Sequence, residues 1–234
     1  MQIPCYLALT AAEFIKAETL PEKCAYMACH FSCYGTGLSN LPQSLPAGSI
    51  IILNDRTPAD RHDPQEILSQ MQALVEQHKP SGVLLDFQRP GVSLTQEVSC
   101  ILADSLPCPV AVTLPYAQAL SCPIFLAPPP LHKPLKDYLA PYQDRELWLE
   151  LAEEAARYII NSEGCVIEEA KDTSLPEPVF ADEAAFCRYH IEVKEDWAEF
   201  TLQRTVKELA DMLSSDCNIT KAVGLYQQLK NMPV

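Results

Sequence analysis

Short apolar runs alternate with amphipathic segments along most of the chain. One such run, residues 82–85, is followed closely by the polar residues Asp86, Gln88 and Arg89. A parallel strand buried on both faces has this pattern, because its polar side chains appear only where the strand reaches the surface. The segment before it, Asp63 to His78, has apolar residues at helical spacing and an Asp-Pro start typical of a helix N-terminus. The pattern therefore predicts strand, helix, strand.

Seven further apolar runs predict strands. Residues 94–106 are expected to form a helix. The link between the fifth strand, residues 109–115, and the sixth, residues 122–127, is too short for a full helix. A helix through Glu146 to Ala156 competes with the seventh strand. Besides the strand that ends at Asp86, the expected strands cover residues 4–10, 24–32, 49–56, 109–115, 122–127, 146–151 and 222–227.

The pattern changes in the last third of the chain. Residues 157–161 and 165–169 predict a β-hairpin, which a strand at residues 186–193 could join. We expect this antiparallel insertion to span residues 157–194. A last helix is expected over residues 196–214, because its apolar residues recur on one helical face.

Eight buried strands alternating with helices predict an irregular (β/α)8 barrel, an α/β fold, with the antiparallel insertion before its last helix and strand. Residues 1–234 are then a single domain, since barrels often occupy this length as one unit. An open doubly wound sheet is the alternative. Against it, no Gly-x-Gly-x-x-Gly motif follows the first strand.

The charge of the chain argues against nucleic-acid and anionic-membrane partners. Its formal net charge is -14, and basic and aromatic residues are nowhere interleaved in a patch. No apolar run approaches the ~18 residues that a membrane span requires. The apolar N-terminus lacks a basic region, so we expect a first strand there rather than a signal peptide. Most of the ten cysteines lie beside apolar strands, which predicts reduced, buried thiols in a cytoplasmic protein.

Residues 81–88 resemble the fourth-strand signature of family 18 glycoside hydrolases, the chitinase-like barrels. That signature reads Asp-Gly-x-Asp-x-Asp-Trp/Phe-Glu. Gly82 and Asp86 match its glycine and its third aspartate. Leu84 replaces the second aspartate, and Gln88 replaces the proton-donating glutamate.

The end of the chain resembles the C-terminal part of the spore-type cell-wall hydrolases of the same family. In those proteins an insertion strand, an acidic loop, a helix and a last strand ending in aromatic-Trp-Gln-Leu follow one another. Here residues 190–196, a predicted helix and residues 224–229 follow in the same order. Gln227 stands where that pattern puts the tryptophan platform under the sugar.

The resemblance implies a mechanism and a defect in it. Family 18 enzymes use substrate assistance: the acetamido oxygen attacks the anomeric carbon, an aspartate orients that group, and a glutamic acid protonates the leaving oxygen. The Gln88 amide can donate a hydrogen bond but cannot transfer its proton at a useful rate, and general acid catalysis contributes ~10²- to 10⁴-fold. We therefore expect a catalytically impaired barrel that binds a carbohydrate of the N-acetylhexosamine type, or another small polar ligand.

The C-terminal ends of the strands build the site in such barrels, so polar residues there are the candidates. An active glycosidase or related hydrolase would pair Asp86 with Asp55 or Glu150 as its catalytic carboxylates. Alternatively, Asp55 and Asp86 form ion pairs with Arg56 and Arg89. The expected ligand-binding residues are Gln88, Arg89, Asn54, Arg56, Tyr116, Tyr226, Gln228 and Tyr34.

No cofactor and no metal are expected. Cys29-His30-x-x-Cys33 has the composition of a metal site, yet strand alternation places Cys29 and His30 on opposite faces and no second Cys-x-x-Cys supplies further ligands. A non-enzymatic interaction protein, with a partner covering the rim, is the third functional hypothesis. Formation of a homo-oligomer is left open.

Overall fold

The structure is a computed structural model that describes residues 3–57, 62–89, 92–118, 120–171, 174–215 and 218–230. Within these ranges, eight parallel strands form a closed ring, because β1 pairs with both β14 and β2. The predicted (β/α)8 barrel is confirmed, and the alternative prediction of an open doubly wound sheet is wrong. In ring order the strands are β1 (Cys5–Leu9), β14 (Ile219–Leu225), β8 (Leu147–Leu151), β7 (Ile124–Leu126), β6 (Val110–Thr113), β5 (Gly82–Asp86), β4 (Ile50–Asn54) and β2 (Cys24–Phe31), with β3 (Leu38–Ser39) antiparallel to β2.

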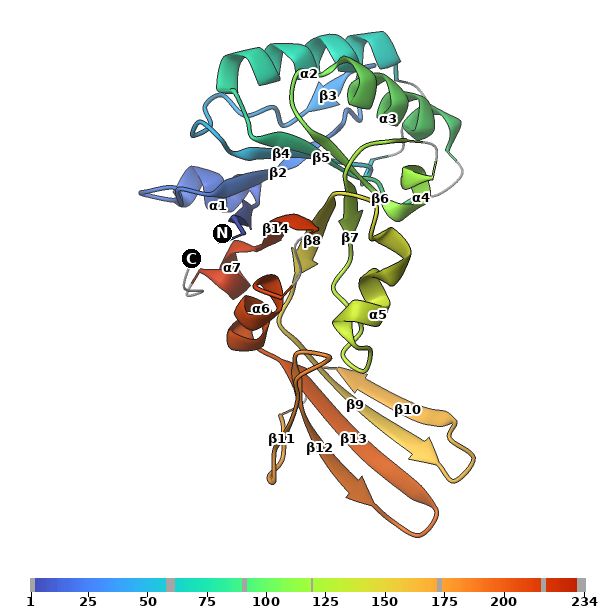
Figure 1. The fold of residues 1–234 in the computed structure, drawn as a ribbon. Helices are drawn as coiled ribbons and strands as arrows, with labels where there is room; N and C mark the ends of the chain where they lie inside the picture. The colour runs from blue at the N-terminus through green and yellow to red at the C-terminus, as the bar shows by residue number, and fades with distance from the viewer. Residues whose placement is uncertain are drawn as a thin grey trace.

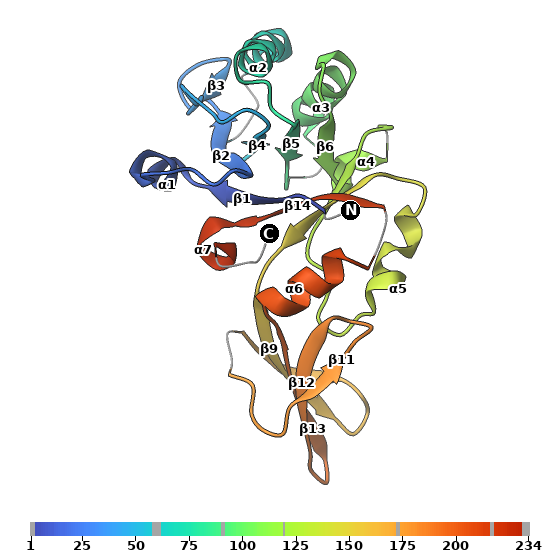
Figure 2. The same ribbon diagram turned by 60° about the vertical axis from the view of Figure 1, so that its left-hand side comes forward.

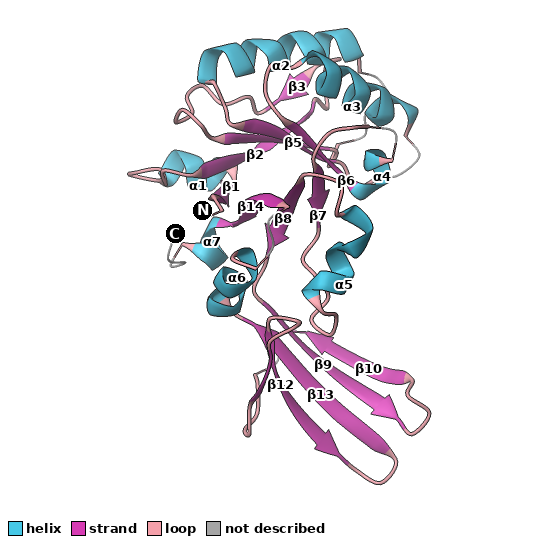
Figure 3. Cartoon of the chain, viewed as in Figure 1, coloured by secondary structure: helices cyan, strands magenta, loops and turns pink. Residues whose placement is uncertain are grey.

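Helices lie outside the ring, and α2 and α3 pack together over one side of it (Figures 1 and 3). Asp63 caps α2 as expected, since its side chain accepts a hydrogen bond from the Gln65 N–H. In the described part of the link between β6 and β7, the only helix is the short α4, which confirms the abbreviated crossover. The helices are α1 (Ala11–Lys16), α2 (Pro64–His78), α3 (Ser93–Ser105), α4 (Leu114–Ala117), α5 (Leu135–Leu139), the 3-10 helix η1 (Ala140–Tyr142), α6 (Val206–Leu213) and α7 (Tyr226–Leu229).

Alternation along the strands divides the apolar core into two layers. One face of each strand packs inside the ring, and the opposite face packs against the helices. Both faces are therefore apolar, which is why the strands appear as continuous apolar runs in the sequence. Leu53, Leu85 and Val112 belong to the outer layer. The inner layer consists of Tyr6, Ala8, Ala25, Ile50, Ile52, Leu84, Ala111, Phe125, Trp148 and Val223.

Trp148 fills the barrel beside the start of β5. Its side chain is fully buried, and a Cβ added at Gly82 would lie 2.5 Å from the indole Cη2 and 2.9 Å from the carbonyl oxygen of Pro109. The Lys221 ammonium lies 4.2 Å from the centroid of the indole ring, a cation–π contact. The missing side chain at Gly82 therefore makes room for the indole.

A separate antiparallel sheet follows β8 and projects from the barrel (Figures 1 and 2). Its strand order is β10-β9-β13-β12-β11. The sheet spans residues 154–204 and is thus longer than the predicted insertion at 157–194. Its strands are β9 (Glu154–Asn161), β10 (Val166–Lys171), β11 (Phe180–Asp182), β12 (Cys187–Val193) and β13 (Trp197–Arg204).

Arg204 joins this sheet to the barrel. Its side chain is fully buried and donates hydrogen bonds to the carbonyl oxygens of Phe186 at 3.1 Å, Ala185 at 2.9 Å and Pro129 at 2.7 Å. It also forms an ion pair with Glu154 at 3.2 Å. A buried guanidinium needs such partners, because an unpaired buried charge is costly. The root of the sheet is thus held to the loop after β7.

The prediction of a helix over residues 196–214 is wrong for the first half of this range. Residues 197–204 form β13, which pairs with both β9 and β12. Phe200 and Leu202 fit a strand face as well as a helix face, so the pattern alone does not separate the two structures. The helix begins only after Thr205, which forms a capping box with Glu208.

Two other boundaries are settled by pairing. Residues 147–151 form a strand of the ring, so the competing helix is wrong. The predicted strand at residues 222–227 is shifted, because β14 starts at Ile219 and the chain turns into α7 at Tyr226. The sequence pattern missed the start of this strand because Lys221 interrupts the apolar run there.

Replacing Gly82 by alanine is expected to destabilise the barrel by about 1–3 kcal/mol, because overpacking a dense core forces side chains off their rotamers or shifts the backbone. Denaturant unfolding followed by circular dichroism measures this change. Gly35→Ala is the matched control: its new Cβ would meet only Ser32 Oγ, at 3.6 Å, and its stability should stay within about 0.5 kcal/mol of the wild type. Equal effects of the two substitutions would contradict the role of Gly82.

Candidate functional site

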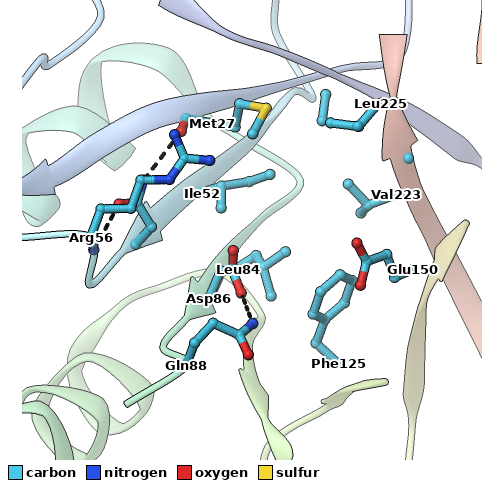
Figure 4. A pocket seen from close by; sticks show the side chains of 13 residues that line it. Met27, Ile52, Arg56, Leu84, Asp86, Gln88, Phe125, Glu150, Val223 and Leu225 are labelled. Carbon is cyan, nitrogen blue, oxygen red and sulfur yellow. Dashed lines mark hydrogen bonds between the residues drawn. The ribbon is translucent and has the colours of Figure 1, made fainter. Parts of the chain in front are cut away.

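A pocket of about 100 Å³ opens at the carboxyl ends of the barrel strands (Figure 4). Ile52, Leu84, Phe125 and Val223 line it and also belong to the inner core of the barrel. We call it the Asp86 pocket. Its full lining is Ala8, Met27, Ile52, Asn54, Arg56, Leu84, Asp86, Gln88, Phe125, Glu150, Val223, Gly224 and Leu225.

Asp86 is the last residue of β5 and lines the pocket together with Leu84, two residues before it on the same strand face. The Gln88 side-chain amide donates a hydrogen bond to its carboxylate (Figure 4). Burial raises the pKa of the Asp86 carboxyl above its usual value; the bond from Gln88 and the charge of Arg56 act in the opposite direction. Asp86 and Gln88 thus lie together at the pocket.

Glu150, on β8, lies on the other side of the pocket (Figure 4). Two strands of the ring, β6 and β7, separate it from β5. Burial raises the pKa of the Glu150 carboxyl, and the negative charge of Asp86 raises it further. The pocket therefore holds two carboxyl groups, and the charge of Asp86 disfavours the ionisation of Glu150.

The loop after β5 is held by hydrogen bonds from three directions. The Asp55 carboxylate accepts from the backbone N–H groups of Gln88, at 3.1 Å, and Arg89, at 2.8 Å. The Thr113 hydroxyl donates to the Phe87 carbonyl oxygen. The Tyr116 hydroxyl donates to the Arg89 carbonyl oxygen. These side chains position Gln88 and are not among the residues that line the pocket.

Asn54 and Arg56 form the side of the pocket next to β2. The Asn54 amide donates to the carbonyl oxygens of Met27 at 3.2 Å and Cys29 at 2.9 Å, and its oxygen accepts from the Arg56 N–H at 3.2 Å. The Arg89 guanidinium donates to the Arg56 carbonyl oxygen at 2.9 Å. The backbone of Arg56 is therefore fixed on both sides, and Arg89 acts on the loop rather than in the pocket.

Besides Arg89 and Tyr116, three further predicted ligand-binding residues are not among those that line the pocket. Tyr34 is fully exposed on the loop after β2. Tyr226 and Gln228 belong to α7, beyond the end of β14. Gln227, at the expected place of the tryptophan platform, also belongs to α7 and does not line the pocket.

Leu225 lines the pocket at the end of β14, and sequence reasoning missed it. Alternation along this strand supplies the signal, because Val223 and Leu225 share one strand face. An aliphatic side chain therefore occupies the rim at the end of the last barrel strand. Phe125 was also missed, since the pattern marked β7 as buried without assigning its faces.

The cysteines do not form a reactive or metal-binding centre in the described part of the chain. Each described cysteine is a free thiol. Burial raises the pKa of Cys5 to about 11 and that of Cys29 to about 12, which disfavours the thiolate that would react or bind a metal. Among all residues that the structure describes, no group of three or more His, Cys, Asp or Glu side chains could hold a metal ion. Likewise, no described helix is long and apolar enough to cross a membrane.

Solved structures share this arrangement of strands. The spore cortex-lytic enzyme SleL from Bacillus cereus is similar over 95% of this chain and 70% of its own, with a TM-score of 0.58 and 10% identity. A GH18 chitinase from Cycas revoluta, solved in complex with (GlcNAc)3, is similar over 96% of this chain and 95% of its own, with a TM-score of 0.51 and 9% identity. The chain has the barrel fold of family 18 chitinases.

The same fold is found in the chitinase-like agglutinin RobpsCRA from Robinia pseudoacacia. This protein covers 94% of the chain with 93% of its own length, at a TM-score of 0.51 and 10% identity. No family model matches the sequence, and no curated protein matches it at a significant level. At these identities the likeness establishes the fold, and the chemistry must be argued from the pocket itself.

Removing the Glu150 charge is expected to stabilise the protein at neutral pH. A carboxyl group whose pKa is raised on folding binds its proton more tightly in the native state, so its stabilising effect is complete below the unfolded pKa of about 4.3 and is lost as pH rises through the native value. Glu150→Gln should therefore melt at a higher temperature than the wild type at pH 7, and the difference should shrink toward pH 4. The exposed Glu76→Gln is the control. Melting curves by circular dichroism test this; a difference that does not depend on pH would contradict it.

Proposed function

We propose that this barrel binds a carbohydrate of the N-acetylhexosamine type in the Asp86 pocket and does not hydrolyse it by the family 18 route. One observation carries the proposal: the Asp86 carboxylate faces the pocket and is hydrogen-bonded to an amide, Gln88, instead of standing beside an acid. Such a pair can bind polar groups. It cannot deliver a proton to a leaving oxygen.

The pocket suits one polar group with an apolar neighbour. An Asp86 carboxylate can accept hydrogen bonds from a hydroxyl or an acetamido N–H. Leu84 and Phe125 offer an apolar surface to a methyl group or the C–H face of a sugar. A volume of about 100 Å³ is below the ~300–1,000 Å³ of pockets that enclose a drug-sized ligand. An inner substituent would therefore enter the pocket, and the remainder of the saccharide would lie over the rim.

The comparisons support a carbohydrate ligand. A chitinase with this fold has been solved with (GlcNAc)3, and another barrel of the same shape is described as an agglutinin. The position of Gln88 supports the absence of ordinary chitinase chemistry. Leu84 supports it as well, because an apolar side chain stands where the family signature has its second aspartate.

Substituting Asp86 by alanine is expected to weaken binding of (GlcNAc)3 by about 10- to 100-fold, the equivalent of the ~1.5–3 kcal/mol that a hydrogen bond to a charged group contributes. Isothermal titration calorimetry measures the affinity. Asp137→Asn removes one exposed carboxylate from α5 and should leave the affinity unchanged. Binding that survives the loss of Asp86 would place the sugar elsewhere.

A second candidate is a hydrolase that uses Glu150 as its acid. The raised pKa of Glu150 and its position across the pocket from Asp86 favour it. Pairing Asp86 with Asp55 has less support, because both Asp55 oxygens already accept backbone hydrogen bonds.

Hydrolysis of a chromogenic N-acetylglucosamine oligomer separates these two functions. We expect no turnover above that of a heat-denatured sample, because Gln88 replaces the acid. A rate that falls both in Asp86→Ala and in Glu150→Gln, but not in Glu76→Gln, would replace the binding proposal by the hydrolase.

A further inference from the structure

A second pocket, of about 290 Å³, adjoins the Asp86 pocket at the rim. The two share Met27, Asn54 and Arg56 as a common wall. We call the second one the Arg56 pocket. It is lined by Thr10, Ala11, Met27, Ala28, His30, Asn40, Asn54, Arg56 and Thr57.

The two pockets differ in charge. Asp86 and Glu150 face the first, whereas no carboxylate is found among the described residues that line the second. The chain as a whole has 31 Asp and Glu residues against 17 Lys and Arg. The Arg56 pocket is therefore a local departure from a strongly acidic surface.

Two polar side chains of the Arg56 pocket, Asn40 and Thr57, keep a hydrogen to donate. The Thr10 hydroxyl and the Asn54 amide already donate within the protein. His30 Nδ1 lies 2.7 Å from the Phe31 carbonyl oxygen, which can only accept, so this nitrogen bears the proton. His30 Nε2 then accepts from Asn40 Nδ2 at 3.1 Å, and the second hydrogen of that amide is left for a ligand. Thr57 Oγ1 lies 3.2 Å from His30 Nδ1 and cannot donate to this protonated nitrogen, so the contact leaves the hydroxyl hydrogen free.

Arg56 supplies the charge. Asn54 and Arg89 hold its backbone, and its side chain is exposed. Within the described residues its guanidinium forms no hydrogen bond or ion pair, although its charge lowers the pKa of Asp86. A guanidinium presents several N–H groups in a planar fork that matches the two oxygens of a carboxylate or phosphate.

We propose that the Arg56 pocket binds an anionic substituent, a carboxylate or a phosphate, of the saccharide held in the Asp86 pocket. This inference rests on the proposed carbohydrate site and narrows its ligand to acidic sugars. The common wall lets one ligand reach both pockets. A neutral sugar would fill only the first and leave the donors of the second to water.

Three monosaccharides test the proposal by calorimetry or ligand-observed NMR: N-acetylglucosamine, its 6-phosphate, and N-acetylmuramic acid, which is the same sugar with a lactyl carboxylate. At least one acid should bind about 10-fold more tightly than the neutral sugar, the scale of one charge-assisted hydrogen bond. The acid that shows the preference identifies the substituent. The preference should fall as salt is added, because the charge of an exposed guanidinium is screened.

Arg56→Gln should reduce the ratio of acidic to neutral affinity to within about twofold, and the ratio is the readout because Arg56 also lines the first pocket. Lys136→Gln removes one positive charge from α5 and should leave the ratio unchanged. Melting temperatures confirm that each variant is folded.

Two results would overturn the inference and leave the carbohydrate site standing: neutral sugar that binds in an Asp86-dependent manner with an acid preference near one, or a preference that Arg56→Gln does not change. Acidic sugars that bind through Arg56 without any effect of Asp86→Ala would instead overturn the proposed carbohydrate site. Lack of binding by all three sugars would overturn both.

Discussion

Closure of the parallel sheet is the constraint on which this structure depends. Because β1 pairs with both β14 and β2, the ring has no free edge, and each strand must present one side-chain face to the inside. The inside is filled by large residues such as Trp148, which a glycine at position 82 accommodates. What remains open is the carboxyl end, where the inward faces change from apolar to polar.

This end concentrates charge in a small space. The charge of Asp86 disfavours the ionisation of Glu150, while Arg56 favours that of Asp86, so two partly buried acids and one exposed cation lie together at the site. Around it, the side chains of Asp55, Thr113 and Tyr116 form hydrogen bonds with the backbone of the loop that bears Gln88. A scaffold that is rigid at this point is suited to binding, because little order has to be gained when a ligand arrives.

Fold and chemistry separate in this molecule. The strands follow the barrel of chitinases and a spore cortex-lytic enzyme, and the antiparallel sheet is joined to the barrel by the buried Arg204. The rim differs from the family signature at Leu84 and Gln88, the positions where that chemistry needs acids. Barrels of this kind commonly host different functions on one framework, so the fold alone does not fix the chemistry of the site.

The sequence by itself determined the barrel, most of its strands and the meeting of Asp86 with Gln88, because alternation along a short buried strand is a local property. It did not determine whether residues 197–204 were helix or strand, since Phe200 and Leu202 suit both. Nor did it distinguish Asp55 and Tyr116, which support a loop, from Glu150, which lines the pocket, and it missed Leu225. Only the tertiary structure decided these points, because the ring's register sets which strand ends meet, and hydrogen bonds between distant segments decide which polar groups remain for a ligand.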